Sequence, residues 1–316
     1  MNAEVKIVTG RSNPEIAEKI ARATHRELSK VTIRNFSDGE IWVKFEENVR
    51  GVDLYIVQST SAPSDNWMEL LMLIDAAKRA SASRITAVLP YFGYARQDRK
   101  DQPRVAITAK LMANLLTQAG ANRVITMDMH TPQLQGFFDI PLDHLYASTM
   151  TIPVLAALGL DNLTVASPDV GGVKTARSYA KMLGDDVDLA VVDKRRPKHN
   201  VAEVMNIIGE VSGRNIIIVD DLIDTGSTFV KCAEAMKAAG AKQIFGLCTH
   251  PVFSGTAVDK ICSSEAISKL FVTDTIPLRD HHPKIEVISV ASLFAEAILR
   301  THENQSISSL FDKIQN

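Results

Sequence analysis

The chain has 316 residues, of which 46% are hydrophobic and 23% are charged, and its formal net charge is -2. This length is enough to bury a sizeable core and predicts two domains. The nearly balanced charge excludes a general affinity for nucleic acid or for an anionic membrane, because both require a broad basic surface. Any phosphate binding is therefore expected to be local.

The cysteines and the N-terminal segment bear on the compartment. Cys232, Cys248 and Cys262 are odd in number and show no C-x-x-C spacing, which favours buried thiols in the cytoplasm over a disulfide framework or a zinc site. The segment "MNAEVKIVTG" has no basic region followed by an apolar stretch, and the chain contains no run of 18 apolar residues. Neither secretion nor a membrane span is predicted.

Short β-branched runs alternate with stretches of helical period. The expected strand and helix pairs are "VKIVTG" with "SNPEIAEKIARATH", "DLYIVQS" with "NWMELLMLIDAAKRA", and "RITAVLP" with "ITAKLMANLLTQAG". This alternation predicts mainly parallel sheets flanked by helices, an α/β fold. The segment "RNFSDGEIWVKF" around Gly39 instead predicts an N-terminal antiparallel hairpin.

A helix and strand unit occurs twice. Thr108 and Thr228, Gly120 and Gly240, and His130 and His250 are each 120 residues apart, and each trio marks a helix, its closing glycine and the end of the next strand. The repeat indicates two duplicated domains. We expect an N-terminal domain over residues 1–147 and a C-terminal domain over residues 148–316.

The segment "IIIVDDLIDTGSTF" (216–229) places acids at the end of a strand that reads as buried on both faces. Asp220, Asp221 and Asp224 precede residues 225–228, which are small and open a helix. Backbone N–H groups at a helix N-terminus form a phosphate cradle, and carboxylates accept hydrogen bonds from the vicinal hydroxyls of a ribose. A solvated turn with one capping side chain is the alternative, but it explains one acid rather than three.

The chain has neither G-x-x-x-x-G-K-[ST] nor G-x-G-x-x-G, so it lacks a Walker A loop and a dinucleotide fingerprint. Instead, "VDDLIDTGST" resembles the phosphoribosyl-diphosphate loop of the type I phosphoribosyltransferase fold. The motifs "FSDGE", "YARQDRK", "MDMH", "GFFDIPLDHL", "SPDVGG" and "DKRRPKHNVAEVMNIIG" resemble the ribose-phosphate diphosphokinase (phosphoribosyl-diphosphate synthetase) family in order and spacing. The resemblance extends from about residue 5 to residue 311.

The resemblance implies transfer of the diphosphoryl group of ATP to the 1-hydroxyl of ribose 5-phosphate, with release of AMP, for nucleotide biosynthesis. Lys194 and Arg196 would stabilise the transferring group from a mobile loop. The positions implied to bind ribose 5-phosphate are Arg196, Asp220, Asp221, Asp224, Thr225, Gly226, Ser227 and Thr228.

The resemblance also implies two ATP-binding segments. Phe36, Asp38, Gly39 and Glu40 lie in the hairpin, and Arg96, Gln97 and Arg99 lie in the loop 93–104. In the family the hairpin reaches the ATP of a neighbouring subunit, which implies a homo-oligomer, typically a hexamer.

The family uses Mg²⁺, and its protein ligands carry over to His130 and Asp169. Magnesium prefers oxygen ligands and retains water, so His130 instead bonding the phosphates is an alternative. His250 stands at the duplicated position without a metal motif around it and is expected to be structural.

Several positions depart from the family pattern or belong to its regulation. Ser227 stands where glycine is usual, and Val105-Ala106 replaces a segment that commonly contains proline. A site for activating phosphate and inhibiting ADP would use Arg50, Ser81, Arg104, Ser306 and Ser308, with Asn48 where serine is usual. Serine-rich helix ends and a frayed C-terminus explain these residues equally well.

Two other functions share part of this pattern. A nucleobase phosphoribosyltransferase has the sugar-phosphate loop but needs neither the ATP hairpin nor a duplicated domain. A non-catalytic regulatory subunit of the same family is expected to lose the catalytic loop, whereas Lys194 and Arg196 are both present.

Overall fold

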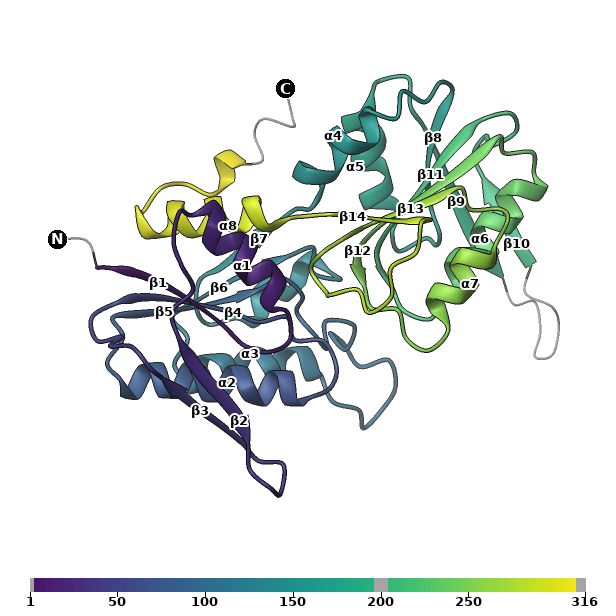
Figure 1. Ribbon diagram of the computed structural model, residues 1–316. Coiled ribbons are helices and arrows are strands. Elements are labelled where there is room, and N and C mark those ends of the chain that lie inside the picture. The colour runs from purple at the N-terminus through teal and green to yellow at the C-terminus, as the bar shows by residue number, and fades with distance from the viewer. Residues whose placement is uncertain (1–2, 196–203, 311–316) are drawn as a thin grey trace. The chain divides into compact units, whose positions relative to one another are not determined.

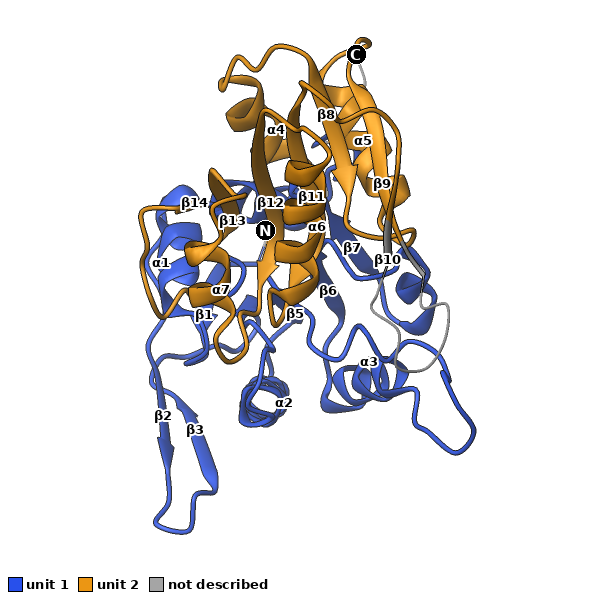
Figure 2. Cartoon of the chain, turned by 90° about the vertical axis from the view of Figure 1, so that its right-hand side faces the viewer, with its two compact units in different colours: residues 1–147, 275–277, 289–312 blue, residues 148–274, 278–288, 313–316 orange. Residues whose placement is uncertain are grey.

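The computed structural model describes residues 3–195 and 204–310, and the remaining residues lie outside the described part (Figure 1). The chain forms two compact units, coloured separately in Figure 2. Unit 1 comprises residues 1–147, 275–277 and 289–312, and unit 2 comprises residues 148–274, 278–288 and 313–316. In the part of the chain that the structure describes, no helix is long and apolar enough to cross a membrane.

Unit 1 contains a five-stranded parallel sheet in the order β1-β4-β5-β6-β7. Helices α1 and α8 cover one face, and α2 and α3 cover the other (Figure 1). The strands are β1 (Val5–Thr9), β4 (Asp53–Val57), β5 (Arg84–Leu89), β6 (Arg123–Met127) and β7 (Leu142–Leu145). The helices are α1 (Pro14–Ala23), α2 (Asp65–Arg79), α3 (Thr108–Ala119) and α8 (Ala291–His302), with the 3-10 turns η1 (Pro132–Phe137) and η2 (Ser308–Leu310).

The segment 289–312 returns to unit 1, although a single boundary after residue 147 was expected. Helix α8 packs on α1, and its Leu293, Phe294 and Ile298 are buried. The Tyr55 hydroxyl donates to the carbonyl of Ile298 at 3.3 Å. Burial of these apolar side chains explains why the C-terminal helix belongs with the N-terminal sheet.

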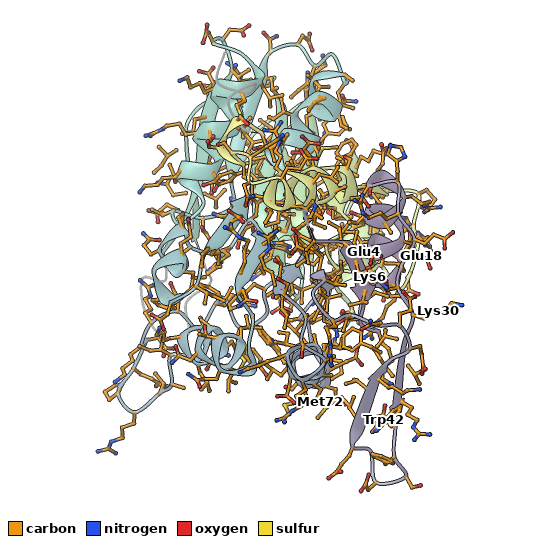
Figure 3. The ribbon with its side chains drawn as sticks, turned by 90° about the vertical axis from the view of Figure 1, so that its left-hand side faces the viewer. Glu4, Lys6, Glu18, Lys30, Trp42 and Met72 are labelled. Carbon is orange, nitrogen blue, oxygen red and sulfur yellow. The ribbon has the colours of Figure 1, made fainter. Side chains whose placement is uncertain are left out.

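The predicted hairpin is present in unit 1. Strands β2 (Val31–Asn35) and β3 (Ile41–Phe45) pair antiparallel and form a separate two-stranded sheet. Strand β3 packs along α2. Figure 3 labels Lys30 at the start of this hairpin, Trp42 on β3 and Met72 on α2.

Unit 2 contains a seven-stranded sheet in the order β10-β9-β8-β11-β12-β13-β14, parallel except for the antiparallel β9 and β10 pair. The strands are β8 (Leu163–Ser167), β9 (Asp188–Arg195), β10 (Val204–Ile208), β11 (Asn215–Ile223), β12 (Gln243–Pro251), β13 (Lys269–Thr273) and β14 (Ile285–Ile288). The helices are α4 (Ser148–Ala156), α5 (Val173–Leu183), α6 (Ser227–Ala238) and α7 (Ala257–Ser263). The fold class is therefore the predicted one: two mainly parallel sheets flanked by helices, with an antiparallel hairpin.

Strand β11 is buried on both faces, as its β-branched run predicted. Ile216 and Ile218 pack with α6 and α7, while Ile217 and Val219 pack with α4 and α5. All four side chains are at most 1% exposed. The repeated units are α3 with β6 and α6 with β12, and each helix is followed by a glycine with positive φ, Gly120 in unit 1 and Gly240 in unit 2.

Candidate active site

The carboxyl end of β11 carries the three predicted acids. Pairing of β11 with β8 ends at Ile218, whereas pairing with β12 continues to Ile223. Asp220 and Asp221 therefore extend past β8 while their backbone stays anchored on β12. Such strand ends are where ligands bind in parallel sheets.

The carboxylates of Asp220 and Asp221 lie close to that of Asp169, which follows β8. Asp220 is half-buried, and the backbone N–H of Asp221 donates to its Oδ1 at 3.0 Å. Burial raises the pKa of Asp220 well above its usual range, and the nearby carboxylates of Asp221 and Asp169 raise it further. Because like charges crowd here, a ligand that donates hydrogen bonds or brings positive charge would relieve the repulsion.

Asp169 follows β8 in the motif "SPDVGG", and its side chain is exposed. Its Oδ1 accepts a hydrogen bond from the backbone N–H of Gly172 at 3.1 Å, and its carbonyl accepts from the Ser167 hydroxyl at 2.6 Å. A Cβ at Gly172 would lie 2.6 Å from Ser167 Oγ, so this tight turn requires glycine. The turn holds Asp169 beside Asp220.

Residues 225–228 form the predicted phosphate loop at the start of α6. Gly226 is the N-cap residue and has φ +73°, a left-handed conformation that favours glycine. Because glycine has no side chain to cap the helix, the first N–H groups of α6 are left for an outside acceptor. Thr225 and Thr228 are exposed, and Ser227 is half-buried.

Lys260 of α7 contacts this loop, and sequence reasoning missed it. Its Nζ donates to Ser227 Oγ at 3.1 Å and lies 3.5 Å from the carbonyl oxygen of Thr225. The two residues of the closer contact are 33 positions apart, and no local pattern links them. A cation is unfavourable at a helix N-terminus by itself, but it suits a bound anion there.

The predicted catalytic pair is only partly described. Lys194 lies in β9, where its Cα is paired with that of Met205 in β10, and its side chain lies outside the described part of the structure. Arg196 lies outside the described residues altogether. Lys194 therefore belongs by its backbone to the sheet that carries the three acids.

In unit 1 the hairpin turn presents the first predicted ATP segment. Phe36 is 48% exposed, and the Arg34 guanidinium lies 5.8 Å from its ring centre and 4.4 Å from that of Trp42. The Phe36 N–H donates to the Glu40 carbonyl at 2.8 Å, and the Glu40 N–H donates to Asp38 Oδ1 at 3.1 Å. These bonds close a turn with an exposed ring beside two exposed acids.

The second predicted ATP segment follows β5. Arg96, Gln97 and Arg99 are exposed, and the Thr108 hydroxyl donates to Gln97 Oε1 at 2.5 Å. The Thr131 hydroxyl donates to Asp98 Oδ2 at 3.0 Å. This bond joins the loop to the residue after His130, so the structure brings these two predicted segments together.

The two predicted metal ligands belong to different units. His130 is exposed in the loop after β6, and Asp169 is exposed after β8. Over residues 3–195 and 204–310, no group of three or more His, Cys, Asp and Glu side chains is placed to hold a metal. His250 is 2% exposed on β12, which is consistent with the structural role expected for it.

The predicted regulatory residues form two local groups and one separate position in unit 1. Gly51 donates its N–H to the Ser81 carbonyl at 2.8 Å, and Arg50 donates its N–H to Asn48 Oδ1 at 3.0 Å. The Ser306 and Ser308 hydroxyls lie 2.7 Å apart. Arg104 is exposed, with φ +70°, in the loop after β5.

Comparison with known proteins decides the family. Residues 5–120 match the model of the N-terminal domain of ribose phosphate pyrophosphokinase, and residues 175–312 match that of the phosphoribosyl synthetase-associated domain. Ribose-phosphate pyrophosphokinase of Chlorobaculum tepidum is 58% identical over 314 residues, which cover 99% of this chain and 96% of that protein. The enzyme of the same name from Ralstonia nicotianae is 56% identical, with 96% and 97% covered.

The chain belongs to the ribose-phosphate pyrophosphokinase family. The crystal structure of phosphoribosylpyrophosphate synthetase from Mycobacterium smegmatis has the same fold, with a TM-score of 0.90, 38% identity, and 95% of this chain and 99% of that chain covered. Pyrophosphokinase and diphosphokinase are two names for one activity, so the predicted family is confirmed. Ribose-phosphate pyrophosphokinase activity therefore replaces the two alternative functions, a nucleobase phosphoribosyltransferase and a non-catalytic regulatory subunit.

Proposed function

We propose that this member of the ribose-phosphate pyrophosphokinase family binds ribose 5-phosphate at the carboxyl end of β11 and transfers the diphosphoryl group of ATP to its 1-hydroxyl. The products are 5-phosphoribosyl 1-diphosphate and AMP. The observation that carries the assignment is the cluster of Asp169, Asp220 and Asp221 beside the uncapped first turn of α6. Crowded acceptors next to an anion seat fit a sugar phosphate and few other small molecules.

The sugar and its phosphate have separate partners. The carboxylates of Asp220 and Asp221 accept hydrogen bonds from the vicinal ribose hydroxyls, with Asp224 beside them. The 5-phosphate lies on the backbone N–H groups of residues 225–228, where the Lys260 ammonium lies 3.1 Å from Ser227 Oγ. Ser227 directs its hydroxyl to Lys260, so a serine in place of the usual glycine is compatible with this seat.

ATP binds through the residues of unit 1. The exposed Phe36 ring stacks on adenine, and the Asp38 and Glu40 carboxylates accept from its exocyclic amine. Arg96, Gln97 and Arg99 bind the phosphates and ribose. Lys194 and Arg196 stabilise the charge that develops during transfer, and no covalent protein nucleophile is needed.

The donor set fits Mg²⁺ held mainly by substrate. The described residues supply no complete set of protein ligands, and Asp169 is an exposed carboxylate next to a crowded Asp220. Magnesium usually keeps several waters and uses one or two carboxylates plus substrate phosphates. Asp169 in unit 2 and, separately, His130 in unit 1 would each contribute a ligand to magnesium, which would supply charge neutralisation of the diphosphoryl oxygens.

The assembly and regulation of the family are proposed for this chain as well. We propose that the protein forms a cytoplasmic homohexamer, in which the hairpin of one subunit reaches the ATP of another. The mass measured by light scattering tests this assembly.

A regulatory site for activating phosphate or inhibiting ADP is proposed at Arg50, Ser81, Arg104, Ser306 and Ser308. Titrating phosphate into the activity assay should raise the rate, and a flat response would remove this site.

The reaction is tested by mixing the protein with ATP, Mg²⁺ and ribose 5-phosphate and measuring AMP. The expected result is AMP formation that depends on the sugar phosphate. Ribose, which lacks the phosphate, is the matched control and should give a far lower rate because the loop 225–228 has no ligand. AMP formation that is independent of ribose 5-phosphate would contradict the assignment.

A further inference from the structure

A chain of hydrogen bonds connects the buried part of unit 1 to the hairpin turn. The Glu69 carboxylate of α2 accepts from Arg11 Nε at 2.6 Å, and Arg11, which follows β1, donates through a terminal nitrogen to Asn35 Oδ1 at 2.7 Å. Asn35, the last residue of β2, donates through Nδ2 to the Gly39 carbonyl at 2.9 Å. The four residues link a helix, a strand end and the tip of the hairpin.

The inner end of this chain is fixed by burial. Glu69 is 2% exposed, and it also accepts from the Arg11 backbone N–H at 2.5 Å and from Gln58 Nε2 at 3.1 Å. A buried carboxylate must be paired, and charge-assisted bonds to a guanidinium are among the strongest. A Cβ at Gly10 would lie 2.3 Å from Gln58 Oε1, so glycine there lets the chain carry Arg11 close to this carboxylate.

The outer end is exposed and is otherwise closed by bonds within the turn itself. Asn35 and residues 37–40 are exposed, and the hairpin is a two-stranded sheet of its own. A two-stranded hairpin is marginally stable without packing, and its turn extends past the strands. Side-chain bonds to the turn therefore have a direct effect on where its exposed groups lie.

We infer that Arg11 and Asn35 are positioning residues that hold the turn 36–40 in the geometry in which it recognises the adenine of ATP; this inference rests on the proposed function of the hairpin. Asn35 suits the role because an amide accepts from Arg11 with one atom and donates to Gly39 with the other. Preorganisation of a recognition surface lowers the cost of ligand binding.

The test is steady-state kinetics of Asn35→Ala and Asn35→Asp in the full-length protein, with AMP as the readout. Asn35→Ala removes both outer bonds, and Asn35→Asp keeps an acceptor for Arg11 but loses the donor to Gly39. Loss of one or two hydrogen bonds predicts a KM for ATP raised about three- to tenfold in both variants. We expect kcat and the KM for ribose 5-phosphate to change less than about twofold.

The matched control is Thr32→Ala, which removes another exposed hairpin bond, from the Thr32 hydroxyl to Glu46 Oε1 at 2.7 Å, away from the turn. It should leave the KM for ATP unchanged. The inference fails if both Asn35 variants keep the original KM for ATP, or if Thr32→Ala raises it equally.

Phe36→Ala separates this inference from the proposed function. If Phe36→Ala raises the KM for ATP and the Asn35 variants do not, the hairpin binds ATP without help from the Arg11 and Asn35 link. If Phe36→Ala also has no effect on the KM for ATP, the turn does not bind adenine and both ideas fail together. A rise in the KM for ATP in both kinds of variant supports the inference.

Discussion

The strand end of β11 and the turn of the hairpin present acids in opposite ways. Asp220 and Asp221 continue a strand whose preceding residues are buried on both faces, so the core fixes their backbone. Asp38 and Glu40 lie on an exposed turn, which side-chain hydrogen bonds through Arg11 and Asn35 link to the rest of unit 1. The strand end is rigid, but its carboxylates are crowded and partly buried. The turn keeps its carboxylates in solvent, and few hydrogen bonds hold it in place.

The difference indicates which step each region serves. Groups that must not move during the transfer are best carried by a packed sheet, because a small displacement lowers the rate steeply. Recognition of an adenine ring needs the turn held in its binding geometry, which a few side-chain bonds can supply. Changes in unit 2 near the acids should therefore alter turnover or sugar binding, and changes at the turn should alter ATP binding.

The largest effect is expected from Lys194→Ala. Lys194 lies on β9 in the same sheet as the acids, and its charge is proposed to act mainly during transfer. Removal of one such group predicts a fall in kcat of about 100- to 1000-fold. Calorimetric binding of ribose 5-phosphate should change less than about threefold, since the sugar's partners remain.

An equal loss of binding and turnover in Lys194→Ala would assign this lysine to ground-state contacts. Lys181→Ala is a useful control, because Lys181 is an exposed lysine in the last turn of α5. That variant should keep the original kcat.

A second test is Asp220→Asn, which separates the stability cost of the acid cluster from its function. The amide removes the charge that burial and two neighbouring carboxylates oppose, so we expect the melting temperature to rise by about 2–4 °C. Sugar binding should weaken about tenfold, because one acceptor becomes partly a donor. A variant that loses stability would show that Asp220 is a structural acid rather than a strained functional one.

The pH dependence of this second test has a defined sign. The pKa of Asp220 is raised in the folded protein, so folding takes up a proton between the ordinary aspartate value and the raised value. Within that window the stability of the original protein falls as pH rises, so the stability gained by Asp220→Asn increases. Above the raised pKa this gain stays constant. Ribose 5-phosphate binding should weaken as pH falls through the raised pKa, because the carboxylate becomes protonated.

Local patterns in the sequence predicted much of the fold and the acid cluster. The run 216–221 indicates both a doubly covered strand and acids at its end, because period and composition are local properties. The return of α8 to unit 1 was missed, because it depends on packing between helices that are far apart in the sequence. The contact of Arg11 with Glu69, 58 positions apart, was missed for the same reason.

The phosphate loop shows the same division between local and long-range information. A helix start after strand-end acids is visible in the sequence, whereas the position of Lys260 depends on how α7 packs beside α6. Ser227 was recognised as a departure from the family pattern, but its partner could be found only in three dimensions.

The smallest effect is expected from Ser227→Gly. The Ser227 hydroxyl accepts from Lys260 Nζ at 3.1 Å, so the change removes a side-chain contact and leaves the backbone N–H groups of the loop in place. Glycine at this helix start costs at most about 1 kcal/mol of stability. The KM for ribose 5-phosphate, measured by AMP formation, should change less than about tenfold, with kcat retained. Complete loss of activity would mean that the serine hydroxyl itself contacts the phosphate, and the seat would then depend on a side chain rather than on the helix N-terminus.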